Sequence, residues 1–163
     1  MEISKNYWDE MGNGKAEEVH TDLFMRALRA LNLEGQDLEK KASLGSLYCG
    51  NLSLALVLNR KLFLAGLGYF AAMEYLVPHR FEHVLAAWER NALPPDDIEY
   101  HRLHITIDVL HARGWFDNVI EPLLKDEPRK AKEVVRGALY RLNSSARYLD
   151  ALIPLIRDAS QTD

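Results

Sequence analysis

The sequence predicts an all-α protein that forms a single helical-bundle domain over residues 1–163. Apolar residues recur at helical spacing along most of the chain, and no stretch alternates polar and apolar side chains as a half-buried strand does. Nine Gly and six Pro are too few for a loop-rich β protein. A chain of 163 residues, 48% of them hydrophobic, is long enough for one ordinary core and too short for two full-sized domains.

The expected helices cover about residues 15–33, 44–77, 80–91, 97–115 and 129–157. Residues that interrupt helices bound them: glycines precede the first helix, and Pro128 precedes the last. The segment 44–77 is apolar nearly all round, so we expect a central, enclosed helix or helix pair that ends at Pro78. The last helix is expected to end near Pro154.

The composition excludes several classes of protein. The net charge is −4, from 20 Lys and Arg against 24 Asp and Glu, which gives no electrostatic footprint for binding nucleic acid. A single Cys rules out a disulfide framework and a thiolate-rich metal site. The start of the chain lacks the basic residues and the apolar run of a signal peptide, so we expect cytoplasmic residence.

The stretch from Ala42 to Asn59 contains no charged residue and approaches the length of a membrane span. It also contains Ser, Asn and Gly residues, and neither an aromatic belt nor a basic cluster flanks it. A helix buried inside the bundle is therefore the better interpretation, and no membrane partner is expected.

The strongest candidate site lies on the helix expected from Asp97 to Trp115. At about 100° per residue, His104, Asp108 and His111 fall within an arc of about 60° on one face. Apolar residues flank this stripe on both sides, and the charged residues of the helix lie on the opposite face. Burying two imidazoles and a carboxylate is costly unless they have partners, and an ion such as Fe or Mn is one such partner.

Two other helices also direct ligand-type side chains inward. His20 lies in the middle of an apolar face with Glu17 at its edge, and Glu10 belongs to a glycine-containing segment that can bend toward the core. Glu74 lies on a helix that is apolar on all sides, where a carboxylate cannot easily reach water. Each residue alone has an ordinary interpretation, such as a core histidine bonded to a carbonyl. Because three helices share the feature, we interpret it as a metal-binding bundle core.

Other candidates are weaker. His79 and His83 are four residues apart and can chelate a metal, but they follow Pro78 in a segment expected to be half-exposed. His101 lies at the edge of the buried stripe, where it can support a ligand without binding metal itself. Cys49 has no His or basic partner nearby in the sequence, so we interpret it as a small core residue.

The chain resembles the heme-oxygenase-like diiron oxidases and oxygenases, also described as iron-containing redox enzymes, among the TenA/PqqC-like helical bundles. The resemblance is carried by Asp9-Glu10-x-Gly12-x-Gly14, Val19-His20-x2-Leu23-Phe24, Glu74 and Tyr100-x3-His104-x3-Asp108-x2-His111-Ala112. It extends from about Asn6 to the end of the chain. It implies a heme-oxygenase-like helical bundle that assembles a non-haem diiron centre and activates dioxygen.

On this resemblance the metal ligands are Glu10, His20, Glu74, His104, Asp108 and His111, with Glu17 as the alternative to Glu10. The implied cofactor is Fe(II), about two ions per chain, and the same donor types also suit Mn. The implied reaction is the oxidation of a small organic substrate, such as an amino acid or a fatty acid, by dioxygen. We expect the substrate to lie near Phe70, Tyr100 and Trp115, although core packing is the other interpretation of the last two.

Family members usually carry one or two further helices before the Asp-Glu motif, whereas about eight residues precede it here. We therefore expect a bundle that is shortened at its N-terminus, with a homodimer covering the apolar surface that results. The alternative function is a non-catalytic or metal-poor bundle that acts as a binding or interaction module. A thiaminase-like enzyme ranks third, because Cys49 is not placed for catalysis.

Overall fold

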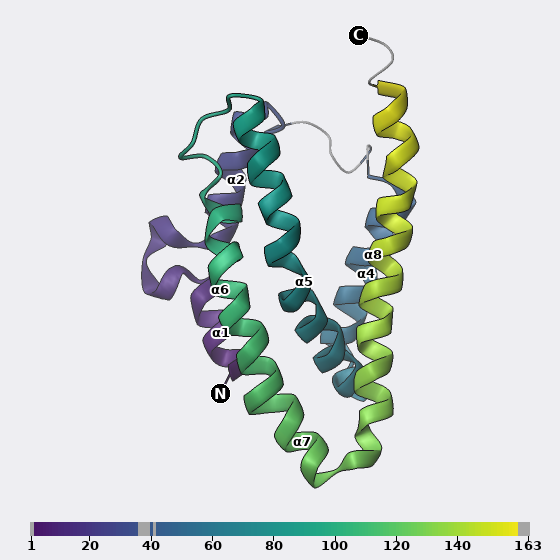
Figure 1. Ribbon diagram of the computed structural model, residues 1–163. Helices are drawn as coiled ribbons and strands as arrows, with labels where there is room; N and C mark the ends of the chain where they lie inside the picture. Colours follow the sequence, from purple (N-terminus) through teal and green to yellow (C-terminus); the bar gives the residue numbers. More distant parts are fainter. Residues whose placement is uncertain (1, 36–39, 41, 160–163) are drawn as a thin grey trace. The chain divides into compact units, whose positions relative to one another are not determined.

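The computed structural model describes residues 2–35, 40 and 42–159, and within these ranges the protein is built from helices without a strand (Figure 1). The α-helices are α1 (Glu2–Glu10), α2 (His20–Ala30), α4 (Leu44–Leu58), α5 (Phe63–Arg90), α6 (Glu99–Trp115), α7 (Glu121–Asp126) and α8 (Ala131–Ala159). Short 3-10 turns lie at Gly12–Gly14, Ala16–Glu18, Arg60–Leu62 and Pro128–Lys130, and a π-helical turn at Phe116–Ile120 joins α6 to α7. The predicted all-α class is confirmed.

The chain divides into two compact units. The first comprises residues 1–37 and 73–126, and so contains α1, α2, α6, α7 and the larger part of α5. The second comprises residues 38–72 and 127–163, and so contains α4, the start of α5 and α8. A single domain over residues 1–163 stays a prediction.

In the first unit, α1 and α2 lie against α6 (Figure 1). An apolar cluster joins Ala27 of α2, Trp88 of α5 and Ile98, the residue before α6. The indole Nε1 of Trp88 donates to the Pro94 carbonyl oxygen over 2.8 Å, which satisfies the one polar group of that buried side chain. The cluster therefore ties α2, α5 and α6 together.

In the second unit, the start of α5 packs closely against α8. A Cβ atom on Gly68 would collide with the carbonyl oxygen of Val134, and a Cβ atom on Gly137 would collide with that of Ala65. Glycine at both positions lets the two helix backbones approach each other without a side chain between them. Glycine is therefore required at positions 68 and 137 by the close approach of the two helices and not by the conformation of a turn.

The core of the second unit forms around Tyr69, which is fully buried beside Leu56 and Ala65. The Tyr69 hydroxyl lies 2.8 Å from Ser53 Oγ and also accepts from Arg141 Nη1 over 3.4 Å. A buried phenol needs such partners, because its hydroxyl would otherwise lose the hydrogen bonds that water provides.

Pro78 does not end a helix, contrary to the sequence prediction. It lies inside α5, which continues to Arg90. A proline in a helix interior removes the hydrogen bond to the carbonyl four residues earlier, here that of Glu74. The burial of Val77 and Phe81 on either side offsets this loss, since tertiary packing overrides local propensity.

Other helix ends also differ from the prediction. α8 continues through Pro154 to Ala159, although a proline in a helix interior removes one backbone hydrogen bond. The segment 44–77 is interrupted at Asn59, and the helix expected from residue 15 begins at His20. The sequence pattern predicts neither α1 nor α7, which are short.

The prediction that the segment starting at Leu44 is enclosed is wrong for α4. Leu56 is the one buried residue of α4. Several of its apolar residues are more than half exposed, namely Leu44, Leu54, Val57 and Leu58. Within its unit, α4 is covered on one side only, through contacts such as that of Cys49 Sγ with the Ser144 carbonyl oxygen, 3.4 Å away in α8.

No single helix in the described ranges is long and apolar enough to cross a membrane. By length and composition alone, α4 and the following helical segment Arg60–Arg90 pass together as a pair bent by 98°.

Replacing Gly68 by Ala is expected to destabilise the protein by about 1–3 kcal/mol, because the added methyl group has no room beside the Val134 carbonyl. Gly50 on α4 is the matched control, since no atom lies within 4 Å of a Cβ placed there. Gly50→Ala is therefore expected to be neutral or to stabilise by up to about 1 kcal/mol. Chemical denaturation of the two variants measures the difference, and equal stability would contradict the close packing of α5 on α8.

Candidate metal centre

Four helices of the first unit bring six acidic and imidazole side chains together. They form a first group of Glu10, His20 and His104, and a second group of Glu74, Asp108 and His111. Within each group, the candidate ligand atoms lie within 4.8 Å of one another. Five of these residues are buried and Glu10 is half-buried. These are the six residues that the family resemblance implies as ligands, with Glu17 as the alternative to Glu10, and their role as metal ligands stays a prediction.

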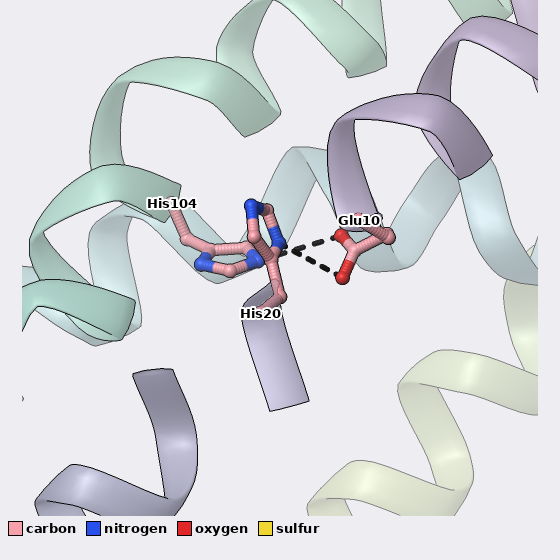
Figure 2. Close-up of side chains that lie close together, drawn as sticks. All are labelled: Glu10, His20 and His104. Carbon is pink, nitrogen blue, oxygen red and sulfur yellow. Dashed lines mark ion pairs between the residues drawn. The ribbon is translucent and has the colours of Figure 1, made fainter. Parts of the chain in front are cut away.

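In the first group, the carboxylate of Glu10 faces both imidazoles (Figure 2). Its Oε2 lies 2.9 Å from His20 Nδ1, and its Oε1 lies 3.6 Å from His104 Nε2. His104 Nδ1 lies 2.6 Å from the Tyr100 carbonyl oxygen and donates to it, so a neutral His104 has its lone pair on Nε2, facing Glu10. Glu17, the alternative to Glu10, is exposed and joins neither group.

The turn after α1 explains how Glu10 reaches His20. Gly12, Asn13 and Gly14 have φ values of 65°, 53° and 85°, in the left-handed region that glycine and asparagine tolerate best. A Cβ atom on Gly12 would lie 2.7 Å from the backbone carbonyl carbon of Glu18, so this position has room only for glycine. The turn folds the chain back on itself and places the end of α1 beside the start of α2.

In the second group, His111 Nδ1 lies 3.4 Å from Glu74 Oε2 and 3.6 Å from Asp108 Oδ1. Asp108 and His111 are three residues apart on α6, and Glu74 comes from α5. His104 precedes Asp108 by about one turn, a rise of roughly 6 Å along the helix axis. Helix α6 therefore contributes residues to both groups, which lie about one helical turn apart along its axis.

Two residues of α1 contact the second group from outside it. Asn6 Nδ2 donates to Glu74 Oε1 over 3.0 Å, and Asp9 Oδ2 accepts from His111 Nε2 over 2.9 Å. Together with Glu10 they occupy positions i, i+3 and i+4, on one face of α1. Sequence reasoning missed Asn6 and the role of Asp9 because α1 has only nine residues and none of them is buried. The i, i+3 and i+4 spacing of Asn6, Asp9 and Glu10 was the sequence signal that could have revealed this polar face.

Electrostatics favour charge separation in the first group. Burial raises the pKa of Glu10, but its contacts with His104 and His20 outweigh burial and lower the pKa to about 2. Burial lowers the pKa of His104, and the contacts with Glu10 and with the Tyr100 carbonyl more than offset this, so the pKa is raised. Glu10 is therefore an anion at neutral pH.

The second group holds a proton in the absence of metal. Burial lowers the pKa of His111, but Asp108, Glu74 and Asp9 outweigh it and raise the pKa to about 10. Burial raises the pKa of Asp108; contact with His111 opposes this, and the Glu74 charge adds to the rise. At neutral pH the metal-free group is thus an imidazolium surrounded by acidic side chains.

Three candidate ligand atoms are buried without a hydrogen-bond partner among the described residues: His20 Nδ1, Asp108 Oδ1 and His111 Nδ1. The 2.9 Å approach of His20 Nδ1 to Glu10 lacks the alignment of a hydrogen bond. Leaving a buried polar atom unpaired costs about 1–3 kcal/mol. Metal ions would satisfy all three atoms, and a donor set of imidazoles and carboxylates suits iron or manganese. The residues present therefore fit a metal centre.

The three aromatic residues expected near a substrate lie in different surroundings. The Tyr100 ring packs on His104 with centroids 4.2 Å apart, and burial raises the pKa of Tyr100 to about 12. Trp115 is buried at the end of α6. Phe70 belongs to the second unit, where it packs against Tyr69. That these residues line a substrate pocket stays a prediction.

The weaker candidates join neither group. His101 packs on Phe81 with ring centroids 4.7 Å apart, and burial lowers the pKa of His101 to about 4. It therefore belongs to the apolar wall around the first group. His79 and His83 are exposed and lie 4.9 Å apart, centroid to centroid. Cys49 lies on α4, in the second unit.

Two hollows in the first unit reach the two groups. One, of about 480 Å³, is lined by His20 of the first group together with residues such as Glu17 and Arg26. The other, of about 530 Å³, is lined by Glu74 of the second group together with residues such as Arg113. Both volumes are in the range of small-molecule sites.

The fold and the donor set define a helical protein with a candidate iron centre built from carboxylates and imidazoles. A family model described as iron-containing redox enzyme matches residues 1–146. The chain belongs to this family, whose description places it among the oxidoreductases. Comparison with curated proteins and with solved structures gave no match. The family predicted from the sequence, and the helical fold that it implies, are confirmed.

Metal uptake by the second group is expected to release protons. His111 has a pKa raised to about 10 in the metal-free protein, so near pH 7.5 its Nδ1 must lose a hydrogen before it binds metal. Anaerobic Fe(II) addition in weak buffer with a pH indicator should release about one proton per second-group ion, and affinity should rise between about pH 6 and pH 10. His111→Gln should abolish this release, and uptake without any proton release would contradict the raised pKa.

Proposed function

We propose that this chain is a non-haem diiron oxidase or oxygenase that activates dioxygen and oxidises a small organic substrate. The observation that carries the proposal is the pair of three-residue groups that α6 holds one turn apart. Carboxylates and imidazoles that project from several helices into a bundle core are the means by which di-iron bundle proteins build their centres. Membership of an iron-containing family supports iron as the metal.

The donor set matches what two Fe(II) ions require. Each group offers three protein ligands, which leaves further coordination positions open for dioxygen. Bound iron would supply the electrons that reduce dioxygen and the oxidising power that acts on the substrate. Glu10, Glu74 and Asp108 would balance part of the charge of the bound metals. Mn(II) suits the same donors and is the alternative occupant.

Aromatic side chains cover the two imidazoles of the first group, whereas the Glu10 side chain is 37% exposed. The Tyr100 ring lies 5.1 Å from that of Phe24 and 5.9 Å from that of Phe81, and His20 is only 3% exposed. Because the pKa of Tyr100 is raised to about 12, its phenol stays protonated at neutral pH. Covering the imidazoles in this way limits the access of water to them, and with it the side reactions of reactive oxygen chemistry.

The hollow beside the second group supports a substrate that has both a carboxylate and an apolar part. Tyr75 and Phe116 line it and pack edge to face, with centroids 6.5 Å apart. Arg113 lines the same hollow, and a guanidinium is well matched to a carboxylate; Glu82 and Asp117 also line it and could pair with the amino group of an amino acid. Amino acids and fatty acids have both features, so we propose them as the substrate classes.

The homodimer and the cytoplasmic location stay predictions. The second unit exposes apolar residues on α4 and α8, including Val57, Leu155 and Ile156, and this supports self-association. A second copy of the chain would remove such side chains from water.

Anaerobic titration of the metal-free protein with Fe(II) tests the proposal. We expect about two equivalents to bind per chain, followed by consumption of dioxygen when air is admitted. A variant that combines His79→Ala and His83→Ala is the control, because it removes an imidazole pair outside both groups and should bind the same amount. Binding of one equivalent would indicate a mononuclear site instead. No uptake by the folded protein would reject the enzyme proposal in favour of the non-catalytic bundle.

Asp108→Ala separates a metal ligand from a structural core residue. Asp108 is 3% exposed and its Oδ1 lacks a hydrogen-bond partner, and burial, together with the Glu74 charge, raises the pKa of Asp108 and disfavours its ionised form. We therefore expect the variant to lose tight binding of one iron, while the metal-free fold stays as stable as wild type or becomes slightly more stable.

Denaturant unfolding of the metal-free proteins checks this sign, with Asp22→Ala, at an exposed position of α2, as the control. If Asp108 instead anchors a buried polar network, its removal strands the partners and costs about 3–5 kcal/mol. A drop of that size in the metal-free protein would count against the ligand role.

A further inference from the structure

Asp9 belongs to neither ligand group, yet it is hydrogen-bonded to His111, a member of the second group. Its Oδ2 accepts from His111 Nε2 over 2.9 Å, and its Oδ1 accepts from Asn13 Nδ2 over 3.0 Å. Both carboxylate oxygens therefore already have donors. Its side chain is also one-quarter exposed, unlike the buried members of the second group. These contacts point to a role through His111 rather than to metal ligation by Asp9.

The two nitrogens of His111 face different surroundings. Nε2 is bonded to Asp9, whereas Nδ1 is buried without a hydrogen-bond partner and faces carboxylate oxygens of Glu74 and Asp108. A neutral imidazole carries one hydrogen, so an acceptor that holds it on Nε2 leaves the Nδ1 lone pair for a metal. Without Asp9, the electrostatically favoured place for the hydrogen is Nδ1, between the two carboxylates. That tautomer cannot bind a metal there.

We propose that Asp9 is the positioning residue of the second group: it holds the Nε2–H tautomer of His111 and thereby presents Nδ1 to a metal shared with Glu74 and Asp108. The inference rests on the proposed function, because it requires a metal in that group. A carboxylate that accepts from the outer nitrogen of a metal-binding histidine fixes the ring and raises its basicity. Losing such a carboxylate typically weakens metal binding by about 10–100-fold.

The turn after α1 holds Asp9 in place. Asn13 adopts a left-handed conformation between Gly12 and Gly14, and its amide donates to Asp9 from that position. Because Glu10 directly follows Asp9, the end of α1 serves both groups at once. One carboxylate is a candidate ligand in the first group, and the other orients a ligand in the second. The Asp-Glu-x-Gly-Asn-Gly segment thereby acts as one structural unit.

The full chain with ¹⁵N-labelled histidine, loaded with Zn(II) as a diamagnetic probe, tests the proposal. NMR of the imidazole nitrogens shows which atom of each ring binds the metal, and His111→Gln assigns the signals. Wild type should bind about two Zn(II) ions, with His111 bound through Nδ1. In Asp9→Ala, one ion should bind about 10–100-fold more weakly, the other should be unaffected, and the Nδ1-bound signal of His111 should disappear.

Asp9→Asn keeps the size of the side chain and guards against a folding defect in Asp9→Ala. In wild type, His111 and Asn13 each donate to a different carboxylate oxygen of Asp9, whereas an amide at position 9 has one acceptor oxygen. The ion bound by the second group should therefore lose about 10-fold in affinity. Combining Asp9→Asn with Asn13→Asp reverses the second hydrogen bond and turns the amide oxygen at position 9 toward His111. Affinity should recover in this double variant. Asp22→Asn removes the same charge from an exposed site and should change nothing.

The outcomes separate the two proposals. Failure of wild type to bind metal would remove the proposed centre and the role of Asp9 with it. If wild type binds two ions and Asp9→Ala retains both affinities and the Nδ1-bound His111, the inference about Asp9 alone is overturned. A lower melting temperature with unchanged metal binding would also overturn it, by marking Asp9 as a purely structural contact. The inference is supported if the Asp9 single variants bind one ion more weakly and the double variant recovers the affinity for that ion.

Discussion

The burial of His104, Asp108 and His111 on one face of α6 is the constraint on which the rest of the first unit depends. Two imidazoles and a carboxylate removed from water need partners, and the apolar flanks of α6 provide none. The partners come from three other helices, as Glu10 of α1, His20 of α2 and Glu74 of α5. The helices that surround α6 are thus arranged by polar requirements as much as by apolar packing.

Helix α1 shows this dependence most clearly. None of its residues is buried, and Ile3, Tyr7 and Trp8 are exposed, so apolar contact contributes little to its docking. Its polar face instead contacts the two groups, through Asn6, Asp9 and Glu10. A helix attached mainly by polar contacts to a charged site gains much of its stability from whatever neutralises that site. Metal binding at the two proposed groups would therefore be coupled to the docking of α1 through the same contacts.

Much of the site could be predicted from the sequence, because helical spacing alone separates the faces of α6. His104, Asp108 and His111 share an arc, and no tertiary information is needed to see that apolar residues flank them. Helix ends were harder to predict. Pro78 indicates a break, yet the burial of neighbouring Val77 and Phe81 keeps α5 continuous. An uncharged segment such as α4 predicts burial, yet α4 packs against α8 while Leu44, Val57 and Leu58 stay exposed.

By itself, the sequence determined the helical class, the family and the candidate ligands, with Glu17 as the alternative to Glu10, because each depends on residue types at fixed spacing along one chain. Only the tertiary structure decided how those six divide into two groups, that Glu10 rather than Glu17 meets His20, and that Asp9 meets His111. These pairings join residues as far as 102 positions apart. They are set by the left-handed turn at residues 12–14 and by the packing of α1 on α6, which spacing within a single helix does not encode.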